Sequence, residues 1–182
     1  GTLFFDADND RDLDLFVANG HVMDRIQTLE EDLRYAQPDQ LFANIGTGQF
    51  RDVSAISGPA FARRAVSRGA AYGDYDQDGD LDLLVTHSSG PVALYRNDLP
   101  SGNNWLALEG PLTGAHVTLL CSGQVQTQTA IAGGSYLSTS TPQLHFGLGS
   151  CTQVEHLKIH WLDGTQTEFR DLRVNQTISI KR

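Results

Sequence analysis

The acidic stretch Asp6-Ala-Asp8-Asn-Asp10-Arg-Asp12-Leu-Asp14 returns 68 residues later as Asp74-Tyr-Asp76-Gln-Asp78-Gly-Asp80-Leu-Asp82. Carboxylates this close repel one another by roughly 1 kcal/mol per pair even in water, so the pattern is typical of a loop that holds a cation. Hard oxygen donors at every second position suit Ca²⁺, which accepts about six to eight oxygens in a flexible shell. The sequence therefore predicts two calcium sites, with Ca²⁺ as the cofactor and these metal ligands: Asp6, Asp8, Asp10, Asp12, Asp14, Asp74, Asp76, Asp78, Asp80 and Asp82.

The spacing of the loops excludes an EF-hand. An EF-hand has a bidentate Glu at the last position of its loop and a helix after it, but that position is Val17 in the first copy and Val85 in the second. A Leu-x-Leu-x-Val run ends each copy, and its two-residue period predicts a half-buried strand. Each loop is thus predicted to be a turn that enters a strand. Its first three aspartates would give side-chain oxygens, the fourth a backbone carbonyl and the fifth the closing carboxylate.

The sixth loop position differs between the two copies. Gly79 suits a sharp turn because glycine tolerates positive φ. Arg11 at the equivalent position costs about 1 kcal/mol in that conformation, and it adds a positive charge beside the metal. The first site is therefore predicted to be the weaker one. A solvated acidic turn is the plain alternative, but two copies in the same register favour the metal.

Charge and size limit the possible partners. The chain has 182 residues and is 40% hydrophobic, enough for one large or two small domains. Its net charge is -9, but the two loops contain ten of its 22 acidic residues, and the other 12 nearly balance 13 Lys and Arg. Nucleic acid is not expected as a partner, because no Lys/Arg cluster could neutralise phosphates. No run approaches the roughly 18 apolar residues of a membrane helix, and no signal peptide is recognisable.

Calcium and cysteine bear on the compartment. Weak aspartate loops fill only at the millimolar calcium found outside the cytosol, which favours an extracellular, periplasmic or cell-surface protein. Cys121 and Cys151 permit one disulfide, which would close a loop of about 30 residues and contribute roughly 3–4 kcal/mol. Two buried free thiols are the alternative, and the spacing alone does not decide between them.

Short strands separated by turns predict an all-β fold. Helical spacing occurs only between residues 24 and 36, where we expect either a helix or a long loop with one turn. Similar segments, Leu41 to Asn44 and Leu94 to Asn97, follow the two loops. The chain therefore has repeating units that stack, as in a β-propeller. Alternating apolar residues over 103–182 predict a further small β-domain, a sandwich or a barrel-like one.

Enzyme signatures are missing from the sequence. No His-Glu-x-x-His motif occurs, and Gly133-Gly-Ser135-Tyr-Leu137 lacks the second glycine of a nucleophile elbow. The segment Gly147-Leu-Gly149-Ser-Cys-Thr152 lacks the third glycine of a dinucleotide-binding loop and a helix after it. Both glycine-rich segments are interpreted as turns. His156, Lys158 and His160 share the exposed face of one predicted strand, and a lysine between two histidines argues against a cation there.

Two segments carry a family resemblance. Phe5 to Val22 and Gly73 to Val85 resemble FG-GAP/VCBS repeats, the calcium-loop blades of integrin-type β-propellers. Residues 103–182 resemble the ASPIC/UnbV domain that follows such blades in the cartilage-acidic-protein family, on these motifs: Asn104-Trp105-Leu106, Gly114-Ala-His-Val117, Gly134-Ser-Tyr-Leu-Ser138, His145-Phe-Gly-Leu-Gly149 and Trp161-Leu-Asp-Gly164. The resemblance implies blades with two calcium loops over 1–100, an ASPIC/UnbV-like β-domain over 103–182, and a C-terminal piece of a larger protein. Arg11 in place of glycine departs from the family pattern.

These features predict an exported, calcium-binding β-propeller fragment that serves as a protein-interaction or assembly module, and no catalytic residue is assigned. Two blades leave open sheet edges, so a protein partner or the remaining blades are expected. A subunit of a large membrane-associated complex is one alternative. The other follows from the resemblance, because related domains near natural-product gene clusters imply an accessory or catalytic component of such a pathway.

Overall fold

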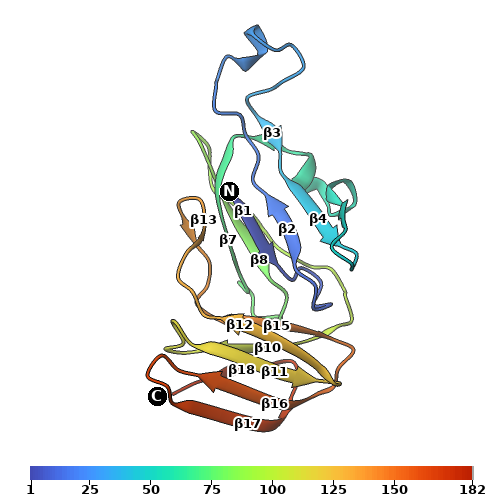
Figure 1. Ribbon diagram of the computed structural model, residues 1–182. Coiled ribbons are helices and arrows are strands. Elements are labelled where there is room, and N and C mark those ends of the chain that lie inside the picture. Colours follow the sequence, from blue (N-terminus) through green and yellow to red (C-terminus); the bar gives the residue numbers. More distant parts are fainter. Residues whose placement is uncertain (182) are drawn as a thin grey trace.

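The computed structural model describes residues 1–181, and strands dominate it throughout (Figure 1). The all-β prediction is confirmed. Two small antiparallel sheets form the upper part in Figure 1. The first has the order β1-β2-β4-β5, with the bounds β1 Thr2–Phe5, β2 Asp14–Val17, β4 Gln40–Asn44 and β5 Phe50–Asp52. The second has the order β7-β8-β9, with the bounds β7 Ser67–Gly73, β8 Asp82–His87 and β9 Ala93–Tyr95.

The two acidic loops occupy the same place in these sheets. The first joins β1 to β2, where Phe5 pairs with Asp14, and the second joins β7 to β8, where Gly73 pairs with Asp82. Side chains alternate between the two faces of each strand. The predicted buried face is correct in the second copy, where Leu81, Leu83 and Val85 are buried. It is wrong in the first copy, where Leu13 is exposed and Phe16 is the fully buried residue, because Phe16 packs on Phe61 and Tyr95 in the core. Buried apolar residues of both sheets and of the segments beside them form one core: Leu3, Phe5, Ala7, Phe16, Ala18, Leu41, Phe61, Ala70, Leu81, Leu83 and Val85. The repeat in the sequence is thus a repeated hairpin with an acidic turn.

Residues 24–36 form a long loop with one short 3₁₀ turn, η1 (Ile26–Thr28), so the loop is the correct one of the two expectations. Only Ile26 of the turn is buried, and Leu29 and Leu33 are exposed. Without an apolar stripe to bury, a helix gains little from packing here. None of the helices among the described residues is long and apolar enough to cross a membrane. The other short elements are β3 Gln37–Pro38, which pairs with β6 Arg64–Ala65, and the 3₁₀ turns η2 Ser54–Ile56 and η3 Pro59–Ala62.

The C-terminal part is a small β-sandwich, as predicted, and no sheet of the described residues closes into a barrel. One sheet has the order β15-β10-β18, with the bounds β10 Asn104–Glu109, β15 Leu144–Gly149 and β18 Gln176–Ser179. The other has the order β12-β11-β16-β17, with the bounds β11 His116–Cys121, β12 Gln124–Thr129, β16 Gln153–His160 and β17 Gln166–Arg173. Between the sheets, Leu106, Val117, Phe146 and Ile159 are fully buried in a second core.

A disulfide joins Cys121, at the end of β11, to Cys151, just after β15, and their Cα atoms are 6.2 Å apart. Of the two alternatives that the sequence left open, the bridge is correct. Both cysteines are buried in the second core. The hairpin of β13 (Gly134–Ser135) and β14 (Ser138–Thr139) leaves the sandwich and packs against β7 (Figure 1).

The two glycine-rich segments that were expected to be turns differ in outcome. The first includes a turn, but it also contains strand β13. The second segment, residues 147–152, contains a turn at Ser150, but the expectation is wrong for Gly147 and Gly149, which belong to β15. The physical reason is a close approach, since a Cβ at Gly147 would lie 1.9 Å from Asp6 Oδ2 of the first acidic loop. Glycine within a strand often marks such an approach rather than a turn.

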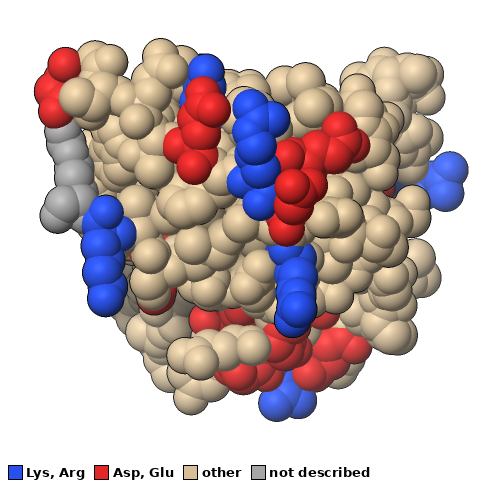
Figure 2. Space-filling view, turned by 90° about the horizontal axis from the view of Figure 1, so that it is seen from below, with Lys and Arg blue, Asp and Glu red and all other residues tan. Residues whose placement is uncertain are grey.

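The outer face of β16 is polar, as its alternation predicts. His156, Lys158 and His160 lie on this face, opposite the fully buried Leu157 and Ile159. Lys158 and His156 contact one carboxylate on β17, that of Glu168, with N–O distances of 2.8 and 3.3 Å. Figure 2 views the molecule from this end and shows basic and acidic side chains interspersed. The charges on this face are therefore balanced locally.

Candidate metal sites in the two acidic loops

The two acidic loops fold alike because each uses its own carboxylates to hold its backbone. The first aspartate accepts the amide of the sixth residue: Asp6 Oδ2 from Arg11 at 2.9 Å, and Asp74 Oδ2 from Gly79 at 3.0 Å. The fifth aspartate accepts two amides, one from the second loop residue and one from an asparagine at or just after the end of the neighbouring strand: Ala7 and Asn44 to Asp14 at 2.9 and 2.8 Å, and Tyr75 and Asn97 to Asp82 at 2.7 and 2.8 Å. The similar segments that end at Asn44 and Asn97 thus share this contact.

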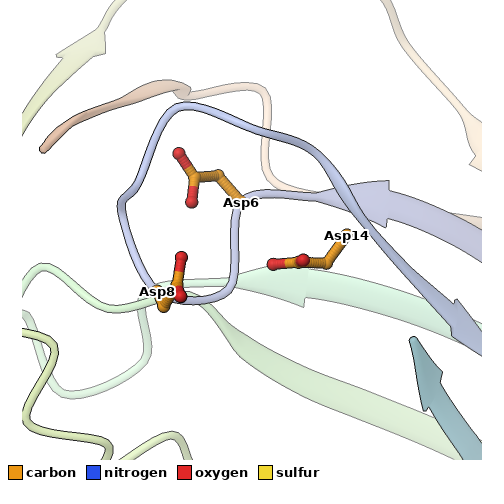
Figure 3. A group of neighbouring side chains, drawn as sticks. All are labelled: Asp6, Asp8 and Asp14. Atoms are coloured by element: carbon orange, nitrogen blue, oxygen red, sulfur yellow. The ribbon is translucent and has the colours of Figure 1, made fainter. Parts of the chain in front are cut away.

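In the first loop three of the five predicted ligands come together. One carboxylate oxygen from each of Asp6, Asp8 and Asp14 lies within 4.8 Å of the others. Figure 3 shows the three side chains directed into the loop. Asp6 and Asp14 are 6% and 5% exposed, and Asp8 is half-buried. Calcium holds its oxygen ligands at about 2.3–2.6 Å, so oxygens at this separation could share one ion, and the donor set fits Ca²⁺.

Burial of like charges makes this loop unfavourable without a cation. Burial, together with the charges of Asp10, Asp8 and Asp14, raises the pKa of Asp6 to about 7, although the hydrogen bond from the Arg11 amide lowers it. Burial also raises the pKa of Asp14 to about 6. A nearby cation favours the ionised form of a carboxylate. The first loop therefore has the electrostatics of a cation site.

In the second loop a different set comes together, the first three aspartates Asp74, Asp76 and Asp78, again with one oxygen each within 4.8 Å of the others. Asp74 is half-buried and the other two are exposed. Within the described part of the chain, the buried Asp74 Oδ1 has no hydrogen-bond partner, which is unusual for a buried carboxylate oxygen. Burial raises the pKa of Asp74. A cation would satisfy this oxygen.

The remaining predicted ligands lie outside these two groups. Asp10 and Asp12 are exposed, and Asp10 Oδ1 accepts the Asp12 amide at 2.8 Å. Asp82 is buried and both of its oxygens accept backbone amides. Asp80 accepts a side-chain amide from the first loop, and burial raises its pKa to about 6. The closing position expected for the fifth aspartate is occupied by Asp14 in the first group, but the second group does not include Asp82.

The sixth position has the same backbone in both loops, with φ of 89° at Arg11 and 94° at Gly79. The predicted left-handed conformation is confirmed. The Arg11 side chain extends to the C-terminal sandwich, where Nε donates to Leu148 O at 2.9 Å and Nη1 donates to Gln124. A Cβ at Gly79 would lie 1.8 Å from the indole nitrogen of Trp105. Backbone and packing together require glycine there.

Sequence reasoning missed a buried histidine that faces the loops. His145 on β15 stacks on Trp105, with ring centroids 5.9 Å apart, and its Nε2 lies 2.7 Å from Asn9 Oδ1. Burial lowers the pKa of His145 to about 4, so the neutral ring donates from Nε2 to the amide oxygen. The only sequence signal is that Asn9 stands where the second loop has Gln77. Nothing local relates Asn9 to a residue 136 positions away.

Comparison with known families matches both parts of the chain. The family described as FG-GAP-like repeat matches residues 6–85, which include both acidic loops. The family described as ASPIC and UnbV matches residues 107–182. The N-terminal part of the chain thus matches an FG-GAP-like repeat, and the C-terminal part matches an ASPIC and UnbV domain. The resemblance inferred from the acidic loops and the C-terminal motifs is thereby confirmed.

Relatives of the FG-GAP-like repeat and the ASPIC and UnbV domain occur in longer proteins. Cartilage acidic protein 1 from Homo sapiens is 29% identical over 171 residues, which cover 87% of this chain and 24% of that protein. The Mus musculus protein of the same name is also 29% identical over 171 residues, 87% of this chain and 25% of its own length. The Xenopus tropicalis protein is 35% identical over 107 residues, 53% of this chain and 16% of its own. The chain thus spans about a quarter of the first two relatives.

Proposed function

We propose that the FG-GAP-like region binds calcium through its two acidic loops, and that the chain is an exported module for protein interaction or assembly without a catalytic role. One observation carries the proposal: each loop gathers three carboxylates around one point. Asp6, Asp8 and Asp14 would hold one ion, and Asp74, Asp76 and Asp78 the other. Bound calcium would supply the positive charge that offsets the repulsion between these carboxylates.

Two features support export. The Cys121–Cys151 disulfide persists in oxidising compartments and is rare where thiols are kept reduced. Aspartate loops with moderate affinity fill at the millimolar calcium outside cells. FG-GAP-like repeats and ASPIC and UnbV domains also suggest an interaction or extracellular module. Oxidising conditions and abundant calcium occur together outside the cytosol, so both features favour the same location.

Apolar side chains on the outer faces of both sheets support a role in assembly. Phe4 and Phe50 are exposed on the first sheet with ring centroids 6.3 Å apart, and the cross-strand neighbours Leu84 and Leu94 are exposed on the second. Exposed apolar patches mark interaction surfaces. We assign these faces to a further FG-GAP-like unit, because repeat units bury their apolar faces against neighbouring units. Sedimentation tests this: wild-type chain should self-associate, and Phe50→Asp should stay monomeric.

Calorimetric titration and thermal unfolding test the calcium part. We expect two binding events, and at free calcium about a hundredfold above Kd each site should add about 2.7 kcal/mol to the free energy of unfolding. Asp6→Asn with Asp74→Asn should abolish both effects. Asp24→Asn, an exposed aspartate outside the loops, is the matched control and should behave as wild type. A melting temperature that is the same in millimolar calcium and in EGTA would contradict the proposal.

A further inference from the structure

Asn9, at the tip of the first acidic loop, connects three segments that lie far apart in the sequence. Its side chain is only 1% exposed. Nδ2 donates to Gly79 O at 3.1 Å and to Asp80 Oδ1 at 2.8 Å, both in the second loop. Oδ1 accepts His145 Nε2 at 2.7 Å, from β15 of the ASPIC and UnbV domain. One amide group thus links both acidic loops to the neighbouring domain.

The backbone of the same tip continues these contacts. Gly149 N, at the end of β15, donates to Asn9 O at 2.8 Å. Next to it, Arg11 Nε donates to Leu148 O at 2.9 Å. Asp8, the residue before Asn9, accepts a hydrogen bond on its carbonyl oxygen from Asn103 Nδ2 at 2.9 Å. These bonds all come from residues 8–11, so docking of the C-terminal domain depends on the shape of this loop.

The shape of the tip is held by carboxylates of the candidate metal site. Asp6 Oδ1 accepts the Asp10 amide at 3.1 Å, and Asp6 Oδ2 accepts the Arg11 amide at 2.9 Å. The tip also has a left-handed backbone, with φ of 61° at Asn9 and 89° at Arg11, which residues other than glycine rarely adopt. Without a cation the gathered carboxylates repel one another and oppose this shape.

We propose that cation binding in the first acidic loop fastens the ASPIC and UnbV domain to the FG-GAP-like region, with Asn9 as the coupling residue. The inference rests on the calcium function proposed above and adds a consequence of binding. The ion fixes the loop, and the loop then presents the amide and carbonyl of Asn9 to His145 and Gly149. By linkage, docking of the domain raises the calcium affinity of the first loop by the same factor as calcium tightens docking.

The second loop offers a matched position for comparison. Gln77 is equivalent to Asn9 and has nearly the same backbone, with φ of 63° against 61°. The Gln77 side chain is exposed, whereas that of Asn9 is buried at the junction. Alanine at either position keeps the left-handed strain. The variants Asn9→Ala and Gln77→Ala therefore differ in whether the junction contacts are lost.

Amide hydrogen exchange measured by NMR on the complete chain tests the coupling. The reporter is the Gly149 amide, whose acceptor is Asn9 O, and the reference is the Ile159 amide in the middle of β16. Saturating calcium should slow exchange at Gly149 by about fivefold or more relative to EGTA, which is the lower end of typical coupling between sites. Exchange at Ile159 reports how far calcium raises the free energy of global unfolding, and the slowing at Gly149 is judged against it. Asn9→Ala should remove the calcium effect at Gly149, and Gln77→Ala should retain it.

Calorimetry on the same samples gives the reciprocal measurement. In the Asp74→Asn background, where only the first site remains, Asn9→Ala should weaken calcium binding by the same factor of about five or more. Gln77→Ala should leave that affinity unchanged. His145→Phe approaches the junction from the other domain, because it keeps a ring against Trp105 and removes the Nε2 donor. His145→Phe should reduce the calcium-dependent slowing of exchange at Gly149, as Asn9→Ala does. It replaces Asn9→Ala in the test if that variant fails to fold.

The outcomes separate the two proposals. If the wild-type chain binds no calcium, the calcium function and the coupling are both overturned. If calcium binds but exchange at Gly149 does not respond, the coupling is overturned and the calcium function stands. The same conclusion holds if Asn9→Ala and His145→Phe keep the wild-type affinity and the wild-type response.

Discussion

Trp105 of β10 stacks on His145 of β15 with ring centroids 5.9 Å apart and planes 18° from parallel. The indole nitrogen of Trp105 fills the place where a side chain at Gly79 would lie. The second acidic loop is therefore packed directly against the ASPIC and UnbV domain. In the first loop the equivalent contact is made by Arg11, whose side chain extends to Leu148. Both loops thus contact the same domain through their sixth residue, by different means.

Gly79→Ala should destabilise the chain by about 2–4 kcal/mol, with about 1 kcal/mol from the left-handed backbone and about 1–3 kcal/mol from overpacking against Trp105. Gly46→Ala is the matched control, because φ is 79° there and nothing lies within 4 Å of the added Cβ. It should cost only about 1 kcal/mol. Urea unfolding measures both losses. Equal losses would show that Trp105 does not restrict this loop.

The acidic loops could be predicted in detail because their geometry is local. Most of the hydrogen bonds that hold each turn join a carboxylate to an amide within a few residues, as in the pair Asp74 and Gly79. Spacing alone therefore predicted the turn, the strand after it and the left-handed sixth position. The alternation of the C-terminal strands likewise predicted their buried faces, such as that of Leu157 and Ile159.

The junction could not be predicted, because it depends on how two separately recognisable parts pack. Asn9 in an acidic loop is indistinguishable from an ordinary turn residue, and its partner His145 is 136 positions away. Gly147 was interpreted as part of a turn, although it is a strand residue that lets Asp6 approach closely. Such contacts are set by tertiary packing and leave no periodic trace in the sequence.

Asp6, Asp14 and Asp80 make the stability of the metal-free protein depend on pH. Their pKa values of about 7, 6 and 6 lie above the ordinary value of 3.8. Between about pH 4 and pH 7 the folded state therefore binds more protons than the unfolded chain, and the contribution of these groups to the free energy of unfolding falls as the pH rises. Bound calcium holds the carboxylates ionised, so with saturating calcium the folded state no longer takes up these protons and the fall over this window should disappear. Urea unfolding in EGTA and in calcium measures both trends.

Asp6→Asn isolates the carboxyl effect from that of His145, which acts in the opposite sense. The pKa of His145 is lowered to about 4 by burial, so its contribution to stability is lost as the pH falls below its ordinary value of 6.5. As the pH rises from about 5 to about 7.5, the free energy of unfolding of the metal-free Asp6→Asn chain should fall less than that of wild type, or rise more. Asp24→Asn should follow wild type. Identical trends in wild type and Asp6→Asn would contradict the raised pKa.

The first calcium site should be the weaker one near pH 7. Protonation of Asp6, with a pKa of about 7, competes with the ion, and Arg11 brings a positive charge to a position that is glycine in the second loop. Asp74→Ala should therefore remove the tighter calorimetric event, and Asp6→Ala the weaker one. Raising the pH to about 8.5 should narrow the difference, because the proton no longer competes. A first site that binds more tightly at pH 7 would refute this order.

The Cys121–Cys151 disulfide should contribute about 3–4 kcal/mol to the free energy of unfolding, as the chain-entropy model gives for a loop of 30 residues. Urea unfolding with and without reductant measures this contribution. Non-reducing mass spectrometry should find no alkylatable thiol in the native chain, since both cysteines are in the bridge and buried in the sandwich core. Two free thiols in native protein purified from an oxidising compartment would refute the bridge and weaken the case for export.

The double variant Cys121→Ala/Cys151→Ala separates the cross-link from packing. The bridge joins the end of β11 to the segment just after β15. Strand β15 itself contacts the first acidic loop. If cross-linking accounts for the effect, the double variant should be about as stable as the reduced wild type and should not respond to reductant. A double variant as stable as the oxidised protein would show that the second core holds these two segments together without the bond.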